Sequence, residues 1–306
     1  MDFKVSAGKI SRNPKRGNYQ MTAQPKEIYA PTATLTAALE KEQNLRRKMR
    51  EMQSVLVAFS GGVDSSYVAL VAAQELGAKA LCVTGISPSV AQAERDMATK
   101  IAADFNFNYA TIETAELEDS NYNSNPTNRC YFCKTELYGK LVPMAKEKNL
   151  RFVLDGSTVD DLGDYRPGRE AARENNIRSP LVEVGLSKNE IRELSKKQNL
   201  PTWDKPSSPC LSSRIAYGIP VSIERLDKIE RGEKFLRDLG FKKFRVRHHD
   251  ELVRLEIAPE ELERALPKEM TERLAEFFRS LGFRYVTLDL HGYRSGAMNE
   301  ILDKNS

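Results

Sequence analysis

A glycine-rich turn between two apolar stretches is the part of the chain best suited to bind phosphate. The turn reads Ser60-Gly61-Gly62-Val63-Asp64-Ser65-Ser66, and it lies between an apolar run at 55–59 and a helix-like run at 67–76. Adjacent glycines let the backbone approach a ligand without an intervening Cβ, and the N–H groups that begin a helix point toward an anion. The turn lacks a Walker A lysine. We therefore predict a phosphate cradle without that lysine, with contacts from Ser60, Gly61, Gly62, Asp64, Ser65 and Ser66.

Cysteines form the second group that could do chemistry. Cys130 and Cys133 are a Cys-x-x-Cys pair at the start of a predicted helix, and Cys210 lies in a loop rich in proline and serine at 201–217. Helix N-termini stabilise thiolates, which ligate metals. Spacing alone leaves open a zinc site one ligand short, a disulfide switch, and an iron–sulfur cluster held by three cysteines. Cys82, within an apolar strand, is predicted to be a buried core thiol.

The elements around these residues alternate between strand and helix. Strands are predicted at 55–59, 80–84, 109–112 and 152–155, with helices at 34–53, 67–76, 89–105, 131–149 and 187–199. This alternation predicts an α/β fold, a parallel sheet with helices on both faces. Ligands bind such sheets beyond the carboxyl ends of the strands, where the glycine turn lies.

A smaller unit is predicted after the loop. It has a helix at 222–239, a hairpin from 244–248 and 252–257, a helical segment at 260–281 interrupted at Pro267, and a strand at 285–290. This order indicates a small α+β domain. We expect a disordered basic leader at 1–33, a nucleotide-binding domain at 34–218 and a C-terminal domain at 219–306 that binds substrate or forms oligomer contacts.

The composition is that of a globular protein in a reducing compartment. Apolar residues make up 40% and charged residues 29%, and the formal charge of +4 gives no general case for nucleic acid. No apolar run approaches a membrane span, no signal-peptide core is present, and four cysteines are too few for a secreted disulfide scaffold. We expect a cytoplasmic location and no membrane partner.

Five separated motifs together resemble the LarE family of PP-loop ATP pyrophosphatases. They are the turn at 60–66 and the segments at 128–138, 155–168, 178–181 and 209–214, and the resemblance extends from about residue 35 to 292–300. LarE proteins are ATP-dependent sulfur transferases that mature the nickel-pincer nucleotide cofactor of lactate racemase. The resemblance implies that ATP and Mg²⁺ activate a carboxylate of pyridinium-3,5-biscarboxylic acid mononucleotide as an adenylate. Sulfur then displaces AMP and leaves a thiocarboxylate.

The resemblance also assigns roles to the cysteines. In one branch of the family, a single cysteine matching Cys210 gives up its own sulfur. In the other, this cysteine and a Cys-x-x-Cys pair hold a 4Fe–4S cluster whose open iron carries an extra sulfide. Because this chain has all three thiols, the resemblance implies that Cys130, Cys133 and Cys210 ligate such a cluster. It further implies a homo-oligomer and maturation proteins of the lactate racemase system as partners, whereas the source of the sulfide is not determined.

Several charged residues are candidates for the remaining roles. Asp64 could bind Mg²⁺ or cap the helix that follows it. Asp160, Asp161 and Asp164 could contact a metal or ribose, or form a solvated acidic loop. Arginine makes forked bonds to phosphate and carboxylate, which suits an anionic nucleotide. By this argument and by the resemblance, we add Arg166 after Tyr165, Arg214, Arg245 and Arg247 as substrate contacts and Glu233 as a metal ligand.

Three other functions fit parts of the pattern. A tRNA thiolation enzyme also pairs a PP-loop with three cysteines, but it usually adds zinc-binding cysteines or an RNA-binding module. An amide-forming synthetase has no use for the three thiols. A non-catalytic iron–sulfur sensor predicts a cluster without release of pyrophosphate.

Overall fold

The computed structural model describes residues 33–163, 166–294 and 297. Almost all of the predicted leader therefore lies outside the described residues. So do Asp164, Tyr165 and most of the C-terminal motif at 292–300. Among the residues described, no helix is long and apolar enough to cross a bilayer.

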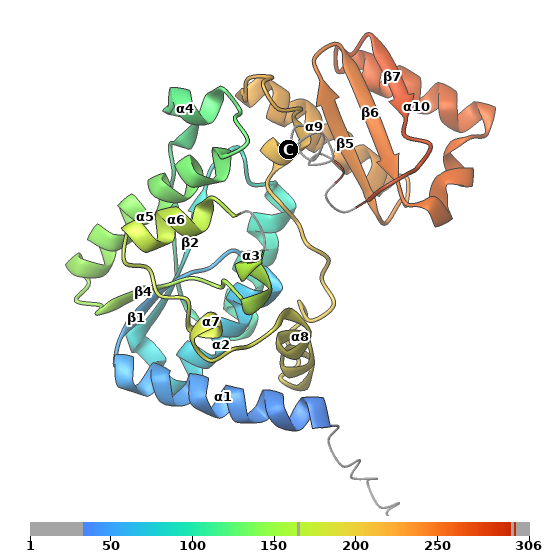
Figure 1. Cartoon of the computed structure of the whole chain (residues 1–306). Helices are drawn as coiled ribbons and strands as arrows, with labels where there is room; N and C mark the ends of the chain where they lie inside the picture. Colours follow the sequence, from blue (N-terminus) through green and yellow to red (C-terminus); the bar gives the residue numbers. More distant parts are fainter. Residues whose placement is uncertain (1–32, 164–165, 295–296, 298–306) are drawn as a thin grey trace, which may run out of the picture.

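The larger part of the chain is built on a four-stranded parallel sheet. Its strand order is β3-β2-β1-β4, and every neighbouring pair is parallel. The strands are β1 (Val55–Ala58), β2 (Ala80–Ile86), β3 (Asn108–Glu113) and β4 (Phe152–Leu154). The predicted α/β fold is thus confirmed, and Figure 1 shows the sheet enclosed by helices.

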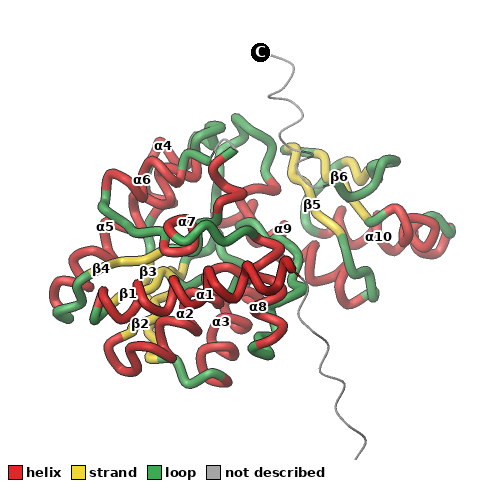
Figure 2. Tube along the Cα trace, turned by 60° about the horizontal axis from the view of Figure 1, so that its bottom comes forward, coloured by secondary structure: helices red, strands yellow, loops and turns green. Residues whose placement is uncertain are grey.

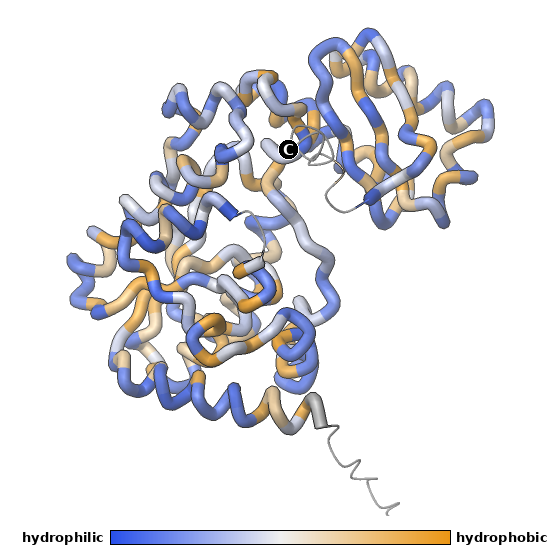
Figure 3. Tube along the Cα trace, in the orientation of Figure 1, coloured by the Kyte–Doolittle hydropathy of each residue, from blue (hydrophilic) through white to orange (hydrophobic). Residues whose placement is uncertain are grey.

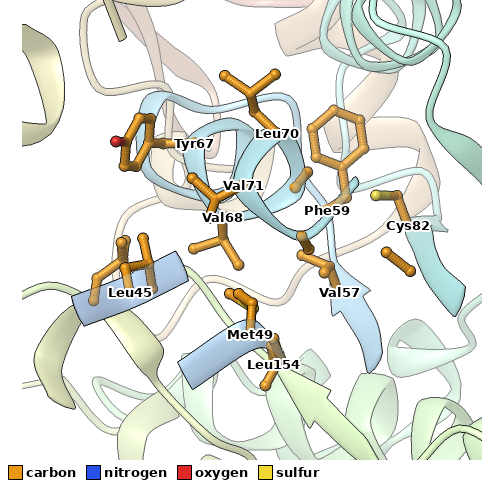
Figure 4. Packing of buried hydrophobic residues seen from close by; sticks show 14 of the residues in the cluster. Leu45, Met49, Val57, Phe59, Tyr67, Val68, Leu70, Val71, Cys82 and Leu154 are labelled. Atoms are coloured by element: carbon orange, nitrogen blue, oxygen red, sulfur yellow. The ribbon is translucent and has the colours of Figure 1, made fainter. Parts of the chain in front are cut away.

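Alternate side chains of this sheet enter two separate cores. On one face, Val57 and Cys82 pack with residues of α1 (Ala33–Met52), α2 (Val63–Leu76), α3 (Gln92–Asp104) and α8 (Lys188–Lys197), as Figure 4 shows in part. On the other face, Leu56 and Leu81 pack with α5 (Arg129–Glu147) and α6 (Gly168–Glu174). Helices therefore cover both faces, as the period of two along each strand requires. Figure 2 shows α1 and α8 side by side. Cys82 is fully buried, as predicted.

The smaller part of the chain has its own sheet of order β5-β6-β7. The strands β5 (Phe244–His249) and β6 (Leu252–Ile257) form the predicted antiparallel hairpin, and β7 (Tyr285–Leu288) pairs parallel to β6. The helices α9 (Ile223–Asp238) and α10 (Lys268–Ser280) pack on one face of this sheet around Val246, Leu255 and Phe278. Tyr122 also joins this core. The division at residue 218 stays a prediction.

Short helical turns connect these elements. The remaining α-helices are α4 (Ser120–Asn123) and α7 (Pro180–Glu183), and the 3-10 turns are η1 (Gly77–Lys79), η2 (Glu116–Glu118), η3 (Val159–Leu162), η4 (Leu211–Arg214) and η5 (Pro259–Ala265). The predicted capping box at the start of α8 is confirmed, because Ser187 and Glu190 bond reciprocally.

Residues 201–210 link α8 to the residues before α9, and we call this segment the strap. Residues 201–204 form turns, and 205–210 have no regular secondary structure. In Figure 1 the strap is the gold loop segment that leads from α8 toward the smaller sheet. In Figure 3 it is mostly pale or blue, because it has few hydrophobic residues. The prediction of a loop through residue 217 is wrong in part. Residues after Cys210 form the turn η4, and Ile215 then pairs with His248 of β5.

Candidate active site

The glycine turn lies at the carboxyl end of β1 and opens directly into α2. Gly61 has φ +67°, and a Cβ on it would lie 2.9 Å from Cα of Ala98. The turn is also approached from β4, because a Cβ on Gly156 would lie 2.7 Å from the backbone nitrogen of Ser65. Both glycines therefore have steric reasons to be glycine. Gly61 lets α3 pack against the turn, and Gly156 lets the segment after β4 approach the start of α2.

Hydrogen bonds within the turn hold its hydroxyls together. The Oγ atoms of Ser60 and Ser65 are 3.0 Å apart, and the backbone N–H of Ser60 donates to Ser65 Oγ at 3.2 Å. Ser66 Oγ is buried without a hydrogen-bond partner among the described residues. The first N–H groups of a helix have no partner within it. The turn thus offers backbone donors and hydroxyls at one point, as an anion site requires.

Asp64 does not cap α2. The N-cap position is Gly62, and no side-chain capping bond is formed there. The Asp64 carboxylate instead lies 3.5 Å from Nζ of Lys188, and its Oδ1 is buried with no hydrogen-bond partner in the described part of the chain. Burial raises the pKa of Asp64, and Lys188 opposes this shift. Because an unpartnered buried carboxylate oxygen can ligate a divalent cation, this arrangement favours a metal-binding role for Asp64 over a capping role.

The acidic segment after β4 is largely used for structure. Asp161 accepts hydrogen bonds from the backbone and hydroxyl of Thr158 and forms an ion pair with Arg166 at 3.1 Å. Asp160 accepts from the backbone of Lys188 at 2.7 Å, at the start of α8. These bonds fix the segment next to Asp64. The negative charge of Asp161 contributes to raising the pKa of Asp64. Arg166 is half-exposed, and its contact with a nucleotide stays a prediction.

The three thiols come from α5 and from the end of the strap. The Cys210 thiol contributes to raising the pKa of both Cys130 and Cys133, so it lies close enough to influence them. All three are free cysteines. Within the described ranges no set of three Cys, His, Asp or Glu side chains is arranged to hold a metal ion. A four-iron cubane separates its ligand sulfurs more widely than one ion does, so the set of three unpaired thiols fits a cluster by its chemistry.

The expected effect of the helix start on these thiols is reversed by burial. Desolvation, followed by the Cys210 thiol, raises the pKa of Cys130 although the residue is exposed overall. The same causes raise the pKa of Cys133 to about 12. Burial disfavours the charged thiolate, so the pKa of both thiols is raised rather than lowered. Cys130 and Cys133 are therefore protonated at neutral pH, and a bound metal would have to displace their protons.

Arg214 and Glu233 form a buried ion pair directly beneath Cys210. Nε of Arg214 lies 2.9 Å from Oε1 of Glu233, and the two side chains are 3% and 8% exposed. The Arg214 guanidinium also donates to the carbonyls of Pro209 and Cys210, the latter at 3.0 Å. In this arrangement Arg214 holds the loop that carries Cys210. Its contact with substrate and metal ligation by Glu233 stay predictions.

Arg245 and Arg247 lie on the face of the smaller sheet that α9 and α10 leave uncovered. Arg247 is buried, bonds to Glu256 at 2.8 Å and donates to the carbonyl of Ser213 at 3.1 Å. Arg245 donates to the carbonyl of Ser207 at 3.1 Å, and burial and the charge of Arg214 lower its pKa. A cavity of about 530 Å³ is lined by Ser208, Arg214, Glu233, Arg237, Lys242 and Arg245 among others. Its basic lining suits an anion.

Two features of the site were missed by the sequence analysis. Glu116 is 2% exposed and accepts hydrogen bonds from Ser87 and Ser89 at 2.5 and 2.7 Å. The backbone N–H of Leu211 donates to the carbonyl of Ser89, so this network fixes the turn after Cys210. The second feature is Lys205, whose Nζ lies at the glycine turn. No local pattern marks either residue, because their partners are distant in sequence.

Comparisons with known proteins bear on the whole chain. The chain is 44% identical to an uncharacterized protein of Synechocystis, over 86% of this chain and 98% of that protein. It is 35% identical to the pyridinium-3,5-bisthiocarboxylic acid mononucleotide synthase of Lactiplantibacillus plantarum, over 86% of this chain and 95% of that enzyme. An uncharacterized protein of Methanocaldococcus jannaschii is 30% identical over 85% and 98% of the two chains.

A family model for asparagine synthase matches residues 39–129. This match includes the glycine turn and ends one residue before Cys130. It thus supports an ATP-using enzyme and has no bearing on the three thiols. The similarity to the synthase, by contrast, extends over both sheets. Together with the glycine turn at the carboxyl end of β1, these findings show that the chain belongs to the LarE family of PP-loop enzymes.

Proposed function

We propose that this protein is an ATP-dependent sulfur transferase that acts on pyridinium-3,5-biscarboxylic acid mononucleotide. The similarity to a pyridinium-3,5-bisthiocarboxylic acid mononucleotide synthase supports the substrate class. The observation that carries the proposal is the position of the strap. Its middle contacts the glycine turn through Lys205, and its C-terminal residue is Cys210, whose thiol contributes to raising the pKa of Cys130 and Cys133. An adenylating site and a sulfur-bearing site are therefore joined by a few residues of chain.

Adenylation solves the problem that a carboxylate is a poor electrophile. A carboxylate oxygen of the substrate attacks the α-phosphorus of ATP, and the bond to pyrophosphate breaks. The negative charge that builds on pyrophosphate needs fixed donors and a divalent cation. The N–H groups at the start of α2 and the hydroxyls of Ser60 and Ser65 supply the donors. Asp64, with its unpartnered Oδ1, is the residue that would bind Mg²⁺.

Sulfur transfer completes the reaction. The sulfur nucleophile attacks the acyl carbon, and AMP leaves with the electron pair of the broken C–O bond. Cys130, Cys133 and Cys210 would hold a 4Fe–4S cluster, which would supply the sulfide. The cavity beside Arg214 and Arg245 would receive the anionic end of the nucleotide. We extend the proposal to a homo-oligomer that works with the maturation proteins of lactate racemase.

Iron analysis tests the sulfur donor. We expect about four irons per chain after anaerobic purification, with loss of iron in Cys130→Ala, Cys133→Ala and Cys210→Ala. Cys82→Ala is the matched control and keeps its iron. A wild-type protein that holds no iron after anaerobic reconstitution would contradict the cluster. Loss of one sulfur from Cys210 during turnover would then identify a consumed cysteine as donor.

Pyrophosphate release tests the substrate. We expect release that depends on the pyridinium dicarboxylate mononucleotide, together with formation of AMP. Ammonia or tRNA in its place should give no product. Release that depends on tRNA would assign the chain to tRNA thiolation, and cluster binding without release would indicate a sensor.

A further inference from the structure

The glycine turn lacks a lysine of its own, but the strap brings one to it. Nζ of Lys205 lies 3.1 Å from the carbonyl oxygen of Gly61 and 2.7 Å from Oε2 of Glu94. The Lys205 side chain is 17% exposed. The ammonium group is thus directed into the nucleotide site and away from solvent. Glu94 lies in the first turn of α3, and α3 packs against the turn through Ala98.

The backbone at Lys205 is held in place by the guanidinium group of Arg192. Arg192 of α8 donates to the carbonyls of Trp203 and Lys205, each at 2.7 Å. The backbone N–H of Lys205 donates to the carbonyl of Thr202 at 3.0 Å. Two guanidinium bonds to alternate carbonyls clamp this part of the strap onto α8. The lysine is therefore presented to the turn by a rigid backbone.

The far end of the strap is fixed to the smaller sheet and to the thiols. Arg245 donates to the carbonyl of Ser207, and Arg214 donates to those of Pro209 and Cys210. Pro206 and Pro209 restrict the backbone between these bonds. Lys205 and Cys210 are therefore joined by a short segment whose backbone is restrained at several points.

We propose that Lys205 binds the β- and γ-phosphates of ATP and couples occupancy of the glycine turn to the position of Cys210. Phosphate oxygens replace Glu94 as the partner of the ammonium group when ATP binds, and Glu94 takes their place again when pyrophosphate leaves. A lysine suits this exchange because its ammonium is a compact charge on a flexible stem. The proposal rests on the proposed function only in that ATP binds at the turn.

Nucleotide affinity tests the contact. We expect Lys205→Ala to weaken ATP binding roughly 10- to 100-fold, because a charge-assisted bond to phosphate is lost. AMP, which lacks the β- and γ-phosphates, should bind with unchanged affinity. Lys205→Arg should recover most of the affinity for ATP. Lys197→Ala, at an exposed lysine of α8, is the matched control and should equal the wild type.

Thiol labelling tests the coupling. In the wild type without iron, we expect ATP, but not AMP, to change the rate at which a maleimide labels Cys210. Mass spectrometry of the labelled peptides separates Cys210 from the other cysteines. In Lys205→Ala, saturating ATP should leave the rate unchanged, while Lys205→Arg restores the response.

The outcomes separate this inference from the proposed function. A wild-type protein that binds no ATP would contradict the proposed function itself. Equal ATP affinity in Lys205→Ala and the wild type would overturn only the role of Lys205. Equal loss of ATP and AMP affinity would indicate that Lys205 merely supports the turn, and it would overturn the phosphate contact.

Discussion

The glycine turn and the cysteine site are built in opposite ways. The turn uses consecutive residues, 60–66, whose geometry follows from a strand, two glycines and a helix start. The cysteine site takes its thiols from α5 and from the strap, and it depends on a buried ion pair and on the hydroxyls of Ser87 and Ser89. The turn is therefore a local structure that packing refines, whereas the cysteine site exists only when both parts of the chain are folded.

This difference has an energetic counterpart. In the turn, Asp64 Oδ1 and Ser66 Oγ are buried and have no hydrogen-bond partners in the described structure. The polar groups beneath Cys210 are mostly satisfied by one another. Buried polar groups without partners lower stability but can bind a ligand. Buried networks in which every group has a partner hold a single geometry. Substitutions at the turn should mainly affect binding, and those beneath Cys210 should mainly affect folding.

The largest effect is expected at the buried ion pair. Glu233→Ala leaves the Arg214 guanidinium buried and unpaired, which should lower the free energy of unfolding by about 3–5 kcal/mol. Urea denaturation measures this change. The double variant Arg214→Met with Glu233→Leu should recover much of the stability, because a well-packed apolar pair avoids the unpaired charge. Glu263→Ala, at an exposed position, should cost less than about 0.5 kcal/mol. A small loss of stability in Glu233→Ala would contradict the expectation that substitutions beneath Cys210 mainly affect folding.

The next largest effect is expected at Asp64, and it should appear in catalysis. Asp64→Asn removes the charge that we assign to Mg²⁺ and should slow pyrophosphate release about 100-fold, or about 2.7 kcal/mol. Stability at neutral pH should not fall, because burial already disfavours the carboxylate and raises its pKa. The raised pKa also predicts that, as the pH is lowered, the metal-free protein protonates Asp64 at a higher pH than an ordinary aspartate and binds Mg²⁺ more weakly. Asp104→Asn, on the exposed end of α3, is the control. Loss of stability with unchanged activity would show that Asp64 is structural.

A third effect is expected where β4 passes the turn. Gly156→Ala places a Cβ against the backbone of Ser65 and should cost about 1–3 kcal/mol of stability, with weaker ATP binding. Gly139→Ala is a matched control, because a Cβ there meets nothing within 4 Å and the residue lies within α5. It should be neutral or stabilise the protein by up to ~1 kcal/mol. Thermal denaturation and nucleotide titration measure both. Equal stability and equal ATP affinity of the two variants would mean that the turn tolerates movement of β4.

The smallest effect is expected at His248, next to the residues that follow η4. Burial, Arg225 and Lys228 lower the pKa of His248 to about 4. The unfolded chain, in which histidine titrates near 6.5, therefore binds more protons between pH 6.5 and 4. Stability should accordingly fall as the pH is lowered through this window, by about 1 kcal/mol because solvent screens the flanking charges.

His248→Phe isolates this contribution. The variant keeps a ring against Phe283 but removes the Nδ1 atom that accepts from the backbone of Asp250. Denaturation at pH 4.5 and 7 should show a smaller difference than in the wild type, while His291→Ala, at an exposed histidine, retains the wild-type difference. An unchanged pH dependence in His248→Phe would assign the acid sensitivity to other groups.

Much of the framework follows from local pattern. The parallel sheet with two covered faces, the capping box at Ser187, the hairpin at β5 and β6, and the phosphate turn were all predicted from short windows of sequence. Each depends on interactions within a few residues or on the period of two or 3.6 that packing requires. The starts of α3 and α5 differ from the prediction by a few residues, because helix ends are decided by packing as well as by propensity. The turn η4 lies where a loop was predicted.

The sequence by itself determined the glycine turn and the elements around it, since glycine geometry and hydrophobic periodicity act over short distances. Only the tertiary structure decided that Arg214 is held by Glu233, that Cys210 faces the thiols of α5, and that Lys205 reaches Gly61. Burial also reversed the expected effect of the helix start on Cys130 and Cys133. The physical reason is the same throughout: desolvation and long-range partners depend on which distant segments pack together, and no local pattern carries that information.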